Sequence, residues 1–363
     1  MRGALAKRAP ICYIEGNPKG GLSMRTLKLA LLGFGSAGRA FARLLLEKEA
    51  EIEARYDTQV AVTAIVTGSH GTLTNSAGLD LRAALDTAEG GGRFPDGDTA
   101  IEVAERGDYD ALLELTPLNI RTGQPAIDHI KTAFARGKHV VTANKGPIAW
   151  AYDDLRARAR RQGCLFFYET TVMDGTPIFN LAEYTLKMAR VTEVSGILNT
   201  TTNYMLEEMA AGKPREEILA AGRRLGFIEA DPAMDIEGYD AAAKLTALLN
   251  VLMDAHMTPD RVDRTGIEHI TPADIQAAAE RDCVIKLVCR GTVKDGQVQA
   301  TVKPAEVPRG DLLAAIDATS SVVSLTTDLM GKLSIVEHDP LIEQTAYGIF
   351  GDVLRVLEGV GRG

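Results

Sequence analysis

The sequence predicts an α/β protein in which an N-terminal doubly wound parallel sheet is followed by an α+β domain. The chain has 363 residues, which is long for one hydrophobic core and favours two domains. Between residues 26 and 145, short apolar runs alternate with amphipathic helical patterns, as in parallel sheets covered on both faces. After residue 145, helical patterns are mixed with hairpin-like strands, which is typical of an α+β domain.

The individual elements follow from the period of the apolar residues. In the first half, apolar runs predict buried strands at 27–35, 60–66, 109–117 and 138–145. Helical spacing predicts helices at 37–54, 81–88 and 123–136. In the second half, strands are predicted at 164–172 and 191–199, helices at 177–189, 204–212 and 241–255, and a hairpin at 283–307 with a Lys-Asp-Gly turn. The amphipathic segment 345–357 is predicted to pack back on the first domain.

Composition and charge restrict the class of partner. The chain has 40 Lys and Arg against 49 Asp and Glu, a formal net charge of −9, and no basic tract, so a nucleic-acid backbone would be repelled. It has no apolar run of the length that crosses a bilayer, about 18–20 residues. The cysteines form no C-x-x-C pair and are expected to be reduced thiols; they are Cys12, Cys164, Cys283 and Cys289. We therefore expect a cytoplasmic protein that acts on a small molecule, with no nucleic-acid and no membrane partner.

A glycine loop follows the first predicted strand. Gly33-Phe-Gly35-Ser36-Ala37-Gly38 fits the pattern G-x-G-x-x-G and opens a helix. In this context the first glycine permits a tight turn, the second lets a pyrophosphate approach the backbone, and the third lets the helix pack on the strand. The alternative is a glycine-rich turn without a ligand, but the position after a strand and before a helix favours a Rossmann-type dinucleotide site.

The sequence leaves the choice between NAD and NADP open. NAD-specific folds place a carboxylate at the end of the second strand, whereas this strand ends in Thr67-Gly68-Ser69-His70. Without that carboxylate a 2′-phosphate is not repelled, and Ser69, His70 or Arg39 could contact it. We expect NADP slightly more than NAD, with use of both open.

The segment 226–245, GFIEADPAMDIEGYDAAAKL, concentrates five carboxylates, and the first cation after them is Lys244. Asp240 and Lys244 are four residues apart at the start of a predicted helix, so they share a face and can form an ion pair. A buried lysine can donate a proton to a developing alkoxide, and carboxylates can bind a substrate ammonium. The alternative is an exposed acidic loop in which Asp240 only favours the helix dipole.

Four motifs in this order resemble the homoserine dehydrogenase family: the glycine loop, ELTP (114–117), TANKGPIA (142–149), and GILNTTTNYML (196–206) followed by the acidic segment. The resemblance implies a Rossmann domain, a mixed-sheet catalytic and dimerisation domain, and a homodimer. It also implies interconversion of L-aspartate 4-semialdehyde and L-homoserine with NADP or NAD.

The same resemblance implies roles for individual residues. Thr116 and Pro117 would lie beside the cofactor, Lys145 would be one of two active-site lysines, and Lys244 would donate and accept the proton. The residues implied to line the substrate pocket are Glu229, Asp235 and Asp240. Less is expected of Asp231 and Glu237, which we interpret as loop residues.

The turn at 169–176 resembles a family loop that holds a sodium ion, mainly through backbone carbonyls. The corresponding residues are Glu169, Val172, Asp174 and Thr176. Oxygen ligands suit such a hard cation. The family has small residues where this chain has Met173-Asp174, and the alternative interpretation is a structural glycine turn before a helix begun by Pro177.

The patterns and the resemblance together predict four parts: a flexible N-terminal extension (1–25), a dinucleotide-binding domain (26–150), a catalytic and dimerisation domain (151–338) and a C-terminal helix packed on the nucleotide-binding domain (339–363). We expect a short form without a regulatory domain. Near the C-terminus the family has a Gly-Ala-Gly turn, whereas this chain has Asp339-Pro-Leu-Ile-Glu343. An oxidoreductase for another small amino-acid-like aldehyde or alcohol therefore stays an alternative, and a non-catalytic nucleotide-sensing protein is a third.

Overall fold

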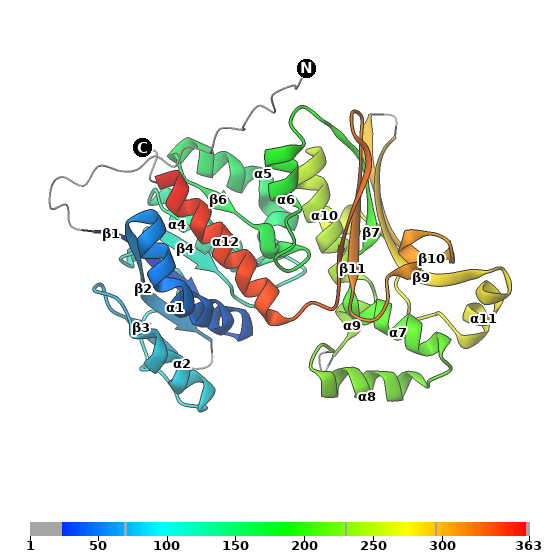
Figure 1. Ribbon diagram of the computed structural model, residues 1–363, viewed down its shortest axis with the longest axis horizontal. Helices are drawn as coiled ribbons and strands as arrows, with labels where there is room; N and C mark the ends of the chain where they lie inside the picture. Colours follow the sequence, from blue (N-terminus) through cyan, green and yellow to red (C-terminus); the bar gives the residue numbers. More distant parts are fainter. Residues whose placement is uncertain (1–23, 69–70, 229–230, 295, 361–363) are drawn as a thin grey trace, which may run out of the picture.

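A computed structural model describes residues 24–68, 71–228, 231–294 and 296–360. These residues form two six-stranded sheets with helices around them, so the predicted combination of a Rossmann-type sheet and an α+β region is confirmed (Figure 1). The strand order of the first sheet is β3-β2-β1-β4-β5-β6, and that of the second is β12-β11-β7-β9-β10-β8.

Five neighbouring strands of the first sheet run parallel, and the edge strand β3 runs antiparallel to β2. The strands are β1 (Arg25–Leu32), β2 (Thr58–Thr67), β3 (Gly71–Thr74), β4 (Ala111–Glu114), β5 (His139–Thr142) and β6 (Phe166–Phe167). The antiparallel edge departs from the fully parallel sheet that we expected. Three residues connect Thr67 to Gly71, which suffices for a hairpin but not for the crossover that a parallel neighbour requires.

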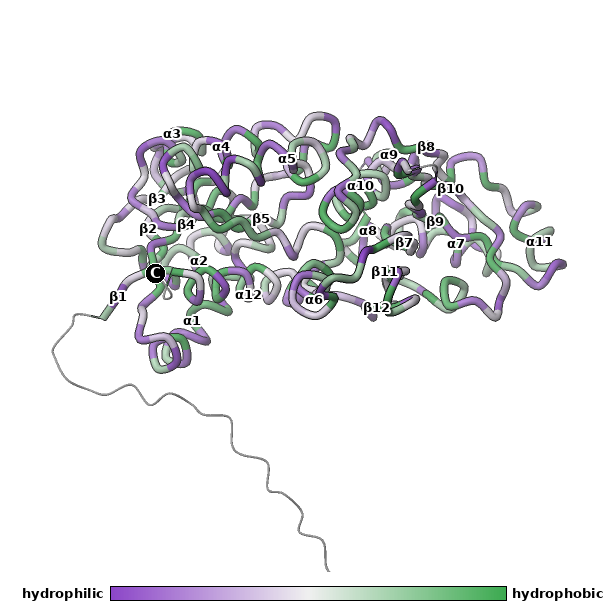
Figure 2. Tube along the Cα trace, turned by 90° about the horizontal axis from the view of Figure 1, so that it is seen from above, coloured by the Kyte–Doolittle hydropathy of each residue, from purple (hydrophilic) through white to green (hydrophobic). Residues whose placement is uncertain are grey.

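Helices cover both faces of this sheet (Figure 2). One face is covered by α1 (Ser36–Tyr56), α2 (Leu81–Glu89) and α12 (Ile342–Val360), and the other by α3 (Ala100–Arg106), α4 (Ala126–Ala135) and α5 (Lys145–Gln162). The last helix lies along α1, and its Ile349 and Val353 share a buried cluster with Phe41 and Leu45. The chain thus returns to the first sheet at its end, because the apolar face of α12 is buried there.

The second sheet is mostly antiparallel and lies beside the first (Figure 1). Its strands are β7 (Val191–Ile197), β8 (Asp263–Arg264), β9 (Cys283–Lys294), β10 (Gln297–Pro308), β11 (Ser321–Thr327) and β12 (Gly331–Glu337). The helices of this half are α6 (Phe179–Thr185), α7 (Thr200–Ala210), α8 (Arg215–Leu225), α9 (Ala233–Ile236), α10 (Tyr239–Met253) and α11 (Pro272–Glu280), with 3₁₀ turns at Glu169–Thr171, Pro259–Arg261 and Leu312–Ala315. The predicted hairpin is confirmed, since β9 and β10 pair antiparallel along their whole length.

One predicted strand and one predicted helix are shorter than expected. Only Phe166–Phe167 of segment 164–172 pairs in a sheet, because the carboxylate of Glu169 accepts the backbone N–H groups of Phe179 and Asn180 and draws the chain into a turn. The helix predicted at 177–189 is confined to Phe179–Thr185. Met188 follows it with a positive φ of 64°.

Helix α10 joins the two halves. Its alanines Ala241, Ala242 and Ala243 point in different directions and are all buried, so these small side chains let the helix pack closely on α5 and on strands β7, β9 and β10. At the N-terminal end of α10, Asp240 meets Lys145 from the first residue of α5. Charged residues of both halves therefore meet at one junction.

Candidate active site

The glycine loop forms a tight backbone cradle between β1 and α1. Gly33 has a φ of +107°, and a Cβ atom built on it would lie 2.3 Å from the carbonyl oxygen of Leu115. A Cβ atom on Gly38 would lie 2.8 Å from the carbonyl oxygen of Gly33. A Cβ on Gly35, by contrast, would meet no atom of the described chain within 4 Å. Gly33 and Gly38 are thus required by backbone packing, while Gly35 borders free space.

The start of α1, beside this space, has the features of an anion-binding helix N-terminus. Gly35 is the N-cap residue of α1, no side chain of the described chain caps this helix, and its first turn, from Ser36 and Ala37 onward, carries no acidic residue. The N-terminal N–H groups and the positive end of the helix dipole are therefore available to an anion.

The region expected to meet the ribose is described only in part. Strand β2 ends at Thr67 without a carboxylate, and Ser69 and His70 lie outside the described residues. The guanidinium of Arg39 donates a hydrogen bond to the carbonyl oxygen of Phe34 at 3.2 Å, within the glycine loop. The choice between NAD and NADP remains a prediction at this position.

The loops that carry Thr116 and Lys145 are tied to each other at the carboxyl ends of β4 and β5. The amide of Asn144 donates to the carbonyl oxygen of Thr116 at 3.2 Å, and its side-chain oxygen caps α5 by accepting the N–H of Gly146 at 3.0 Å. Pro117, next to Thr116, is exposed. Below the loop, the fully buried carboxylate of Glu114 accepts the N–H of Thr116 at 2.9 Å and contacts Nδ1 of His129 at 2.7 Å.

Lys145 and Lys244 both contact Asp240. The Nζ atom of Lys145 lies 3.1 Å from Oδ1 of Asp240, and that of Lys244 lies 3.4 Å from Oδ2. Lys244 also donates a hydrogen bond of 2.8 Å to the carbonyl oxygen of Leu198, at the end of β7. The predicted pairing of Asp240 with Lys244 along one helix face is thus present, and the structure adds Lys145 from the other half of the chain.

Asn199 connects this cluster to Asp235. Its amide group donates to Oδ1 of Asp235 at 2.7 Å and to Oδ2 of Asp240 at 3.0 Å, while its carbonyl oxygen caps α7 through the N–H of Thr202. Thr201 donates to the other oxygen of Asp235 at 2.9 Å. The sequence analysis gave Asn199 no role of its own, although it lies within the motif GILNTTTNYML at the start of a helix.

Burial and neighbouring charges set the protonation of the cluster. Burial would raise the pKa of Asp240, but the ammonium groups of Lys145 and Lys244 outweigh it and hold that pKa well below its usual range. Burial would lower the pKa of Lys244, yet Asp240, Asp174 and Asp235 raise it above the ordinary value. At neutral pH the site therefore holds a carboxylate between two cations.

Asp235 is shifted in the opposite direction. Burial, together with repulsion from Asp240, raises the pKa of Asp235 against the hydrogen bonds from Asn199 and Thr201. The surroundings thus shift the pKa values of Asp235 and Asp240 in opposite directions, which is common in active sites.

The other described carboxylates of segment 226–245, those of Asp231 and Glu237, make no hydrogen bond or ion pair with this network. Glu229, predicted to line the substrate pocket, lies outside the described residues. Asp231 is exposed, and its carboxylate accepts the N–H of Ala233 at 3.1 Å in a local turn. The backbone of Glu237 follows α9 and accepts a hydrogen bond from Arg264.

The turn at 169–176 lies between the second sheet and α12. Both carboxylate oxygens of Glu169 are engaged by backbone N–H groups of Phe179 and Asn180, Val172 is buried, and Asp174 accepts a hydrogen bond from Thr345. Among the described residues, no group of three or more His, Cys, Asp or Glu side chains could hold a metal ion. The predicted sodium ligands Glu169, Val172, Asp174 and Thr176 stay a prediction that would rest on backbone oxygens.

Glu337, which sequence reasoning missed, lies close to this turn. It ends β12 and is 9% exposed. Burial, followed by repulsion from Asp174, raises the pKa of Glu337 to about 7, against a hydrogen bond from Thr176 and the charge of Lys244. The available signal in the sequence was that the chain departs from the family pattern at Asp174 and again near residue 339. The structure brings Asp174 close to Glu337, two residues before position 339.

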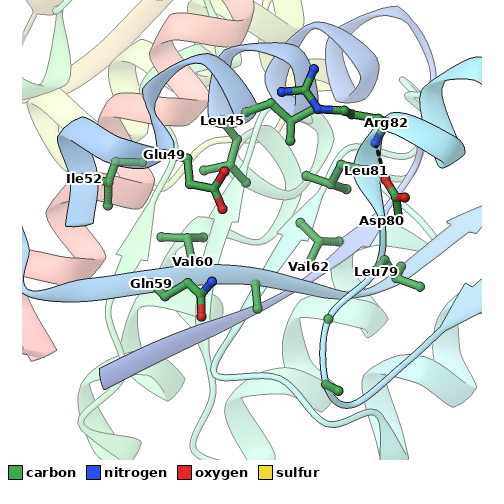
Figure 3. Close-up of a pocket in the computed structure, with 14 residues that line it drawn as sticks. Leu45, Glu49, Ile52, Gln59, Val60, Val62, Leu79, Asp80, Leu81 and Arg82 are labelled. Carbon is green, nitrogen blue, oxygen red and sulfur yellow. Dashed lines mark hydrogen bonds between the residues drawn. The ribbon is translucent and has the colours of Figure 1, made fainter. Parts of the chain in front are cut away.

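A pocket of about 310 Å³ lies elsewhere, between α1, β2 and the segment before α2 (Figure 3). Its walls combine apolar side chains such as Leu45 and Val60 with polar ones such as Glu49 and Gln59, and Asp80, also in its lining, caps α2. Its lining contains neither the glycines of the cradle nor a lysine of the cluster. It therefore lies outside the candidate site.

In the part of the chain that the structure describes, no helix combines the length and the hydropathy needed to span a membrane.

Comparison with known proteins identifies the family. Residues 177–354 match the family described as homoserine dehydrogenase. The chain is 36% identical to the homoserine dehydrogenase of Methanocaldococcus jannaschii, over 91% of this chain and 98% of that protein. It is 34% identical to the NAD(+)-dependent homoserine dehydrogenase of Pseudomonas canavaninivorans, over 93% and 98% of the two chains. The crystal structure of a putative homoserine dehydrogenase from Archaeoglobus fulgidus is similar with a TM-score of 0.82 and 34% identity, over 91% and 99%. The chain therefore belongs to the homoserine dehydrogenase family.

Proposed function

We propose that this protein is a homoserine dehydrogenase, which interconverts L-aspartate 4-semialdehyde and L-homoserine with NADP or NAD. The observation that carries the proposal is the convergence of Lys145 and Lys244 on Asp240, at the junction where the glycine cradle can deliver a nicotinamide. The activity named for the relatives supports the same substrate pair.

The residues of the chain supply the proton and the charge for this reaction. A bound nicotinamide cofactor supplies or takes up the hydride. During reduction, negative charge develops on the aldehyde oxygen, and the ammonium group of Lys244 is suited to donate a proton to it. During oxidation, the neutral amine of Lys244 accepts the hydroxyl proton. Lys145 adds a second positive charge, and Asp240 holds both lysines in register.

The raised pKa of Lys244 affects how the rates of reduction and oxidation depend on pH. Because Asp240, Asp174 and Asp235 keep this lysine charged at neutral pH against the effect of burial, the proton donor for reduction is present there. Oxidation of homoserine needs the neutral amine, so it is expected to accelerate as the pH becomes alkaline.

Carboxylates of the acidic segment are suited to the substrate ammonium. We assign Asp235 to this role, together with Glu229, because Asp240 is already engaged by two lysines. Asn199 and Thr201 hold the Asp235 carboxylate in place from α7. Asp240 thereby belongs to the catalytic set and borders the substrate pocket.

Either dinucleotide is compatible with the cradle. The end of β2 offers no carboxylate to bind a ribose 2′-hydroxyl or to repel a 2′-phosphate, and one relative is named as NAD(+)-dependent. We propose use of both, tested by comparing kcat/KM for NADH and NADPH at fixed semialdehyde.

A related small hydroxy amino acid is the second candidate substrate. The observation in its favour is that two carboxylates, Glu337 and Asp174, lie near Lys244, and that Asp174 stands where the family pattern has a small residue. A panel of hydroxy amino acids separates the two candidates, since a preference for any member over homoserine would favour the second.

The decisive experiment uses the purified chain with L-homoserine and NAD or NADP, and with the semialdehyde and the reduced cofactors. Homoserine-dependent absorbance change at 340 nm, a general property of reduced nicotinamides, is the expected result. Cofactor binding without hydride transfer from any substrate would instead support a non-catalytic nucleotide-sensing protein.

Three further assignments rest on the resemblance and complete the proposal. A homodimer is expected, and light scattering would measure its mass. The sodium site at residues 169–176 predicts a response of activity to Na⁺ when it replaces a large organic cation. A cytoplasmic location is consistent with the free thiols of Cys164, Cys283 and Cys289.

A further inference from the structure

Tyr239 is the first residue of α10 and immediately precedes Asp240. The guanidinium of Arg264, from the edge strand β8, lies 3.6 Å from the centroid of its ring. The same guanidinium donates a hydrogen bond to the backbone oxygen of Glu237. Arg264 thus holds the start of α10 in place by stacking on Tyr239 and by hydrogen bonding to the backbone of Glu237.

The backbone around Arg264 and Tyr239 is closely packed. Gly238 has a φ of +81°, and a Cβ atom on it would lie 3.4 Å from Cγ of Arg264. A Cβ atom on Gly266 would lie 2.2 Å from the backbone oxygen of Ile236, which also accepts the N–H of Ile267 at 2.8 Å. The turn before α10 is therefore pinned to the segment after β8.

Helix α10 has no side-chain hydrogen bond at its N-cap, Gly238, within the described chain. Its first turn carries Asp240, whose contact with Lys145 spans 3.1 Å across the junction of the two halves. The ring of Tyr239, held by Arg264, is thus the largest side-chain anchor at the start of this helix.

The cofactor-binding half approaches Tyr239 from the other side. The guanidinium carbon of Arg121 lies 5.9 Å from the centroid of the Tyr239 ring. Arg121 belongs to the loop that begins at Thr116, and Trp150 of α5 holds this loop by donating to the carbonyl oxygen of Ile120 at 2.9 Å. Residues of both halves line the pocket of about 400 Å³ that contains this stack.

We propose that Tyr239, held by Arg264 and contacted by Arg121, is a positioning residue that fixes Asp240 against Lys145 across the junction. The inference rests on the proposed function, because Asp240 is placed there in the catalytic set. Tyr239 acts through Asp240 and touches neither the cofactor nor the reacting atoms. A misplacement of about 1 Å in such a site can cost about a hundredfold in rate.

The test compares kcat and KM of Tyr239→Ala and Arg264→Ala with those of the unchanged chain. We expect kcat for homoserine oxidation to fall about ten- to a hundredfold in both, with the KM for the cofactor changed less than about twofold. Tyr239→Phe keeps the ring and should stay within about twofold of the unchanged chain. Arg121→Ala, which removes the more distant contact, should lower kcat by less than about fivefold.

Two controls test whether a loss of rate is specific to the contact between Tyr239 and the start of α10. Arg281→Ala removes a surface ion pair with Glu306 on β10 and should leave kcat unchanged. A double-mutant cycle measures whether Tyr239 acts through Asp240: in an Asp240→Asn background, the additional effect of Tyr239→Ala should shrink to less than about twofold.

The outcomes distinguish this inference from the proposed function. If the unchanged chain does not oxidise homoserine, the proposed function fails. If it does, and Tyr239→Ala keeps kcat within about twofold, or if the effects of Tyr239→Ala and Asp240→Asn multiply fully, the positioning role is overturned. An equal loss in Tyr239→Phe would likewise overturn it, because the ring and its stacking would then not matter.

Discussion

The glycine cradle and the lysine–aspartate cluster are built in opposite ways. Gly33, Gly35 and Gly38 lie within six consecutive residues; a Cβ atom would clash with backbone at Gly33 and Gly38, whereas Gly35 borders open space. The cluster instead joins Lys145 to Asp240, ninety-five positions later in the chain, through charged side chains. A contiguous motif can form a cradle by local geometry, whereas the cluster exists only when both halves of the chain are folded against each other.

The cluster should be far more sensitive to loss of a functional group than the cradle. Lys244→Ala removes the proposed proton donor and should lower turnover at least about a hundredfold, as measured by initial rates in both directions. Cofactor affinity, measured by quenching of protein fluorescence, should be retained. Lys213→Ala, which removes a surface lysine paired with Glu208, is the matched control, and normal turnover in Lys244→Ala would refute the assigned role.

Asp240→Asn tests whether the cluster works through charge. The folded-state pKa of Lys244 is raised, with Asp240 the first of the groups that raise it against burial, so removing that charge should lower it. The neutral amine then forms at lower pH, and the rising limb of homoserine oxidation should move to lower pH with a reduced maximum. A pH profile of kcat measures this shift. A limb that stays in place would mean that another group titrates.

Within the cradle, two glycine substitutions should separate packing from binding. Gly33→Ala places a Cβ atom 2.3 Å from the Leu115 oxygen at a φ of +107°, so it should destabilise the fold by roughly 1–3 kcal/mol or more. Gly35→Ala has space for its methyl group and a φ of −74°, so thermal stability should be nearly unchanged. Its methyl group would occupy the space of the pyrophosphate, and the KM for the cofactor should rise about fivefold or more.

Thermal unfolding measures the loss of stability in Gly33→Ala, and titration with the cofactor measures the loss of affinity in Gly35→Ala. Equal loss of stability in both variants would contradict the distinction between the two glycines. Unchanged cofactor affinity in Gly35→Ala would show that the open space beside Gly35 is not where the dinucleotide binds.

Asp231→Asn is expected to have the smallest effect. The Asp231 carboxylate is exposed and accepts a single backbone N–H in its own turn, so activity should stay within about twofold and stability within about 0.5 kcal/mol. Asp235→Asn, four residues later, is the matched comparison, because its carboxylate is held by Asn199 and Thr201 and should affect the KM for homoserine. A large loss in Asp231→Asn would remove the distinction between site and loop carboxylates.

Sequence reasoning anticipated the fold from strong local patterns. Apolar strands such as β1 and β4, and the full hairpin of β9 and β10, were predicted because burial on both faces or a glycine turn leaves a clear pattern. It predicted no strand at Gly71–Thr74, where the structure has the antiparallel edge strand β3, since this short segment carries no clear apolar alternation. It also predicted too long a strand at 164–172, where Glu169 instead caps α6.

The candidate site was predicted less completely. Asp240 and Lys244 were paired correctly from their four-residue spacing, because one helix carries both. Asn199 and Glu337 were missed, since each reaches the site from a different element and neither belongs to a spacing pattern.

The sequence by itself determined the elements whose interactions are local: the glycine cradle, the helical face of Asp240 and Lys244, and the alternation that builds the first sheet. The tertiary structure decided which groups that are distant in the chain lie in contact. It brought Lys145 to Asp240, Arg264 and Arg121 to Tyr239, and Asp174 to Thr345. The physical reason is that backbone geometry and helical periodicity act over a few residues, whereas burial and charge pairing depend on how whole elements pack.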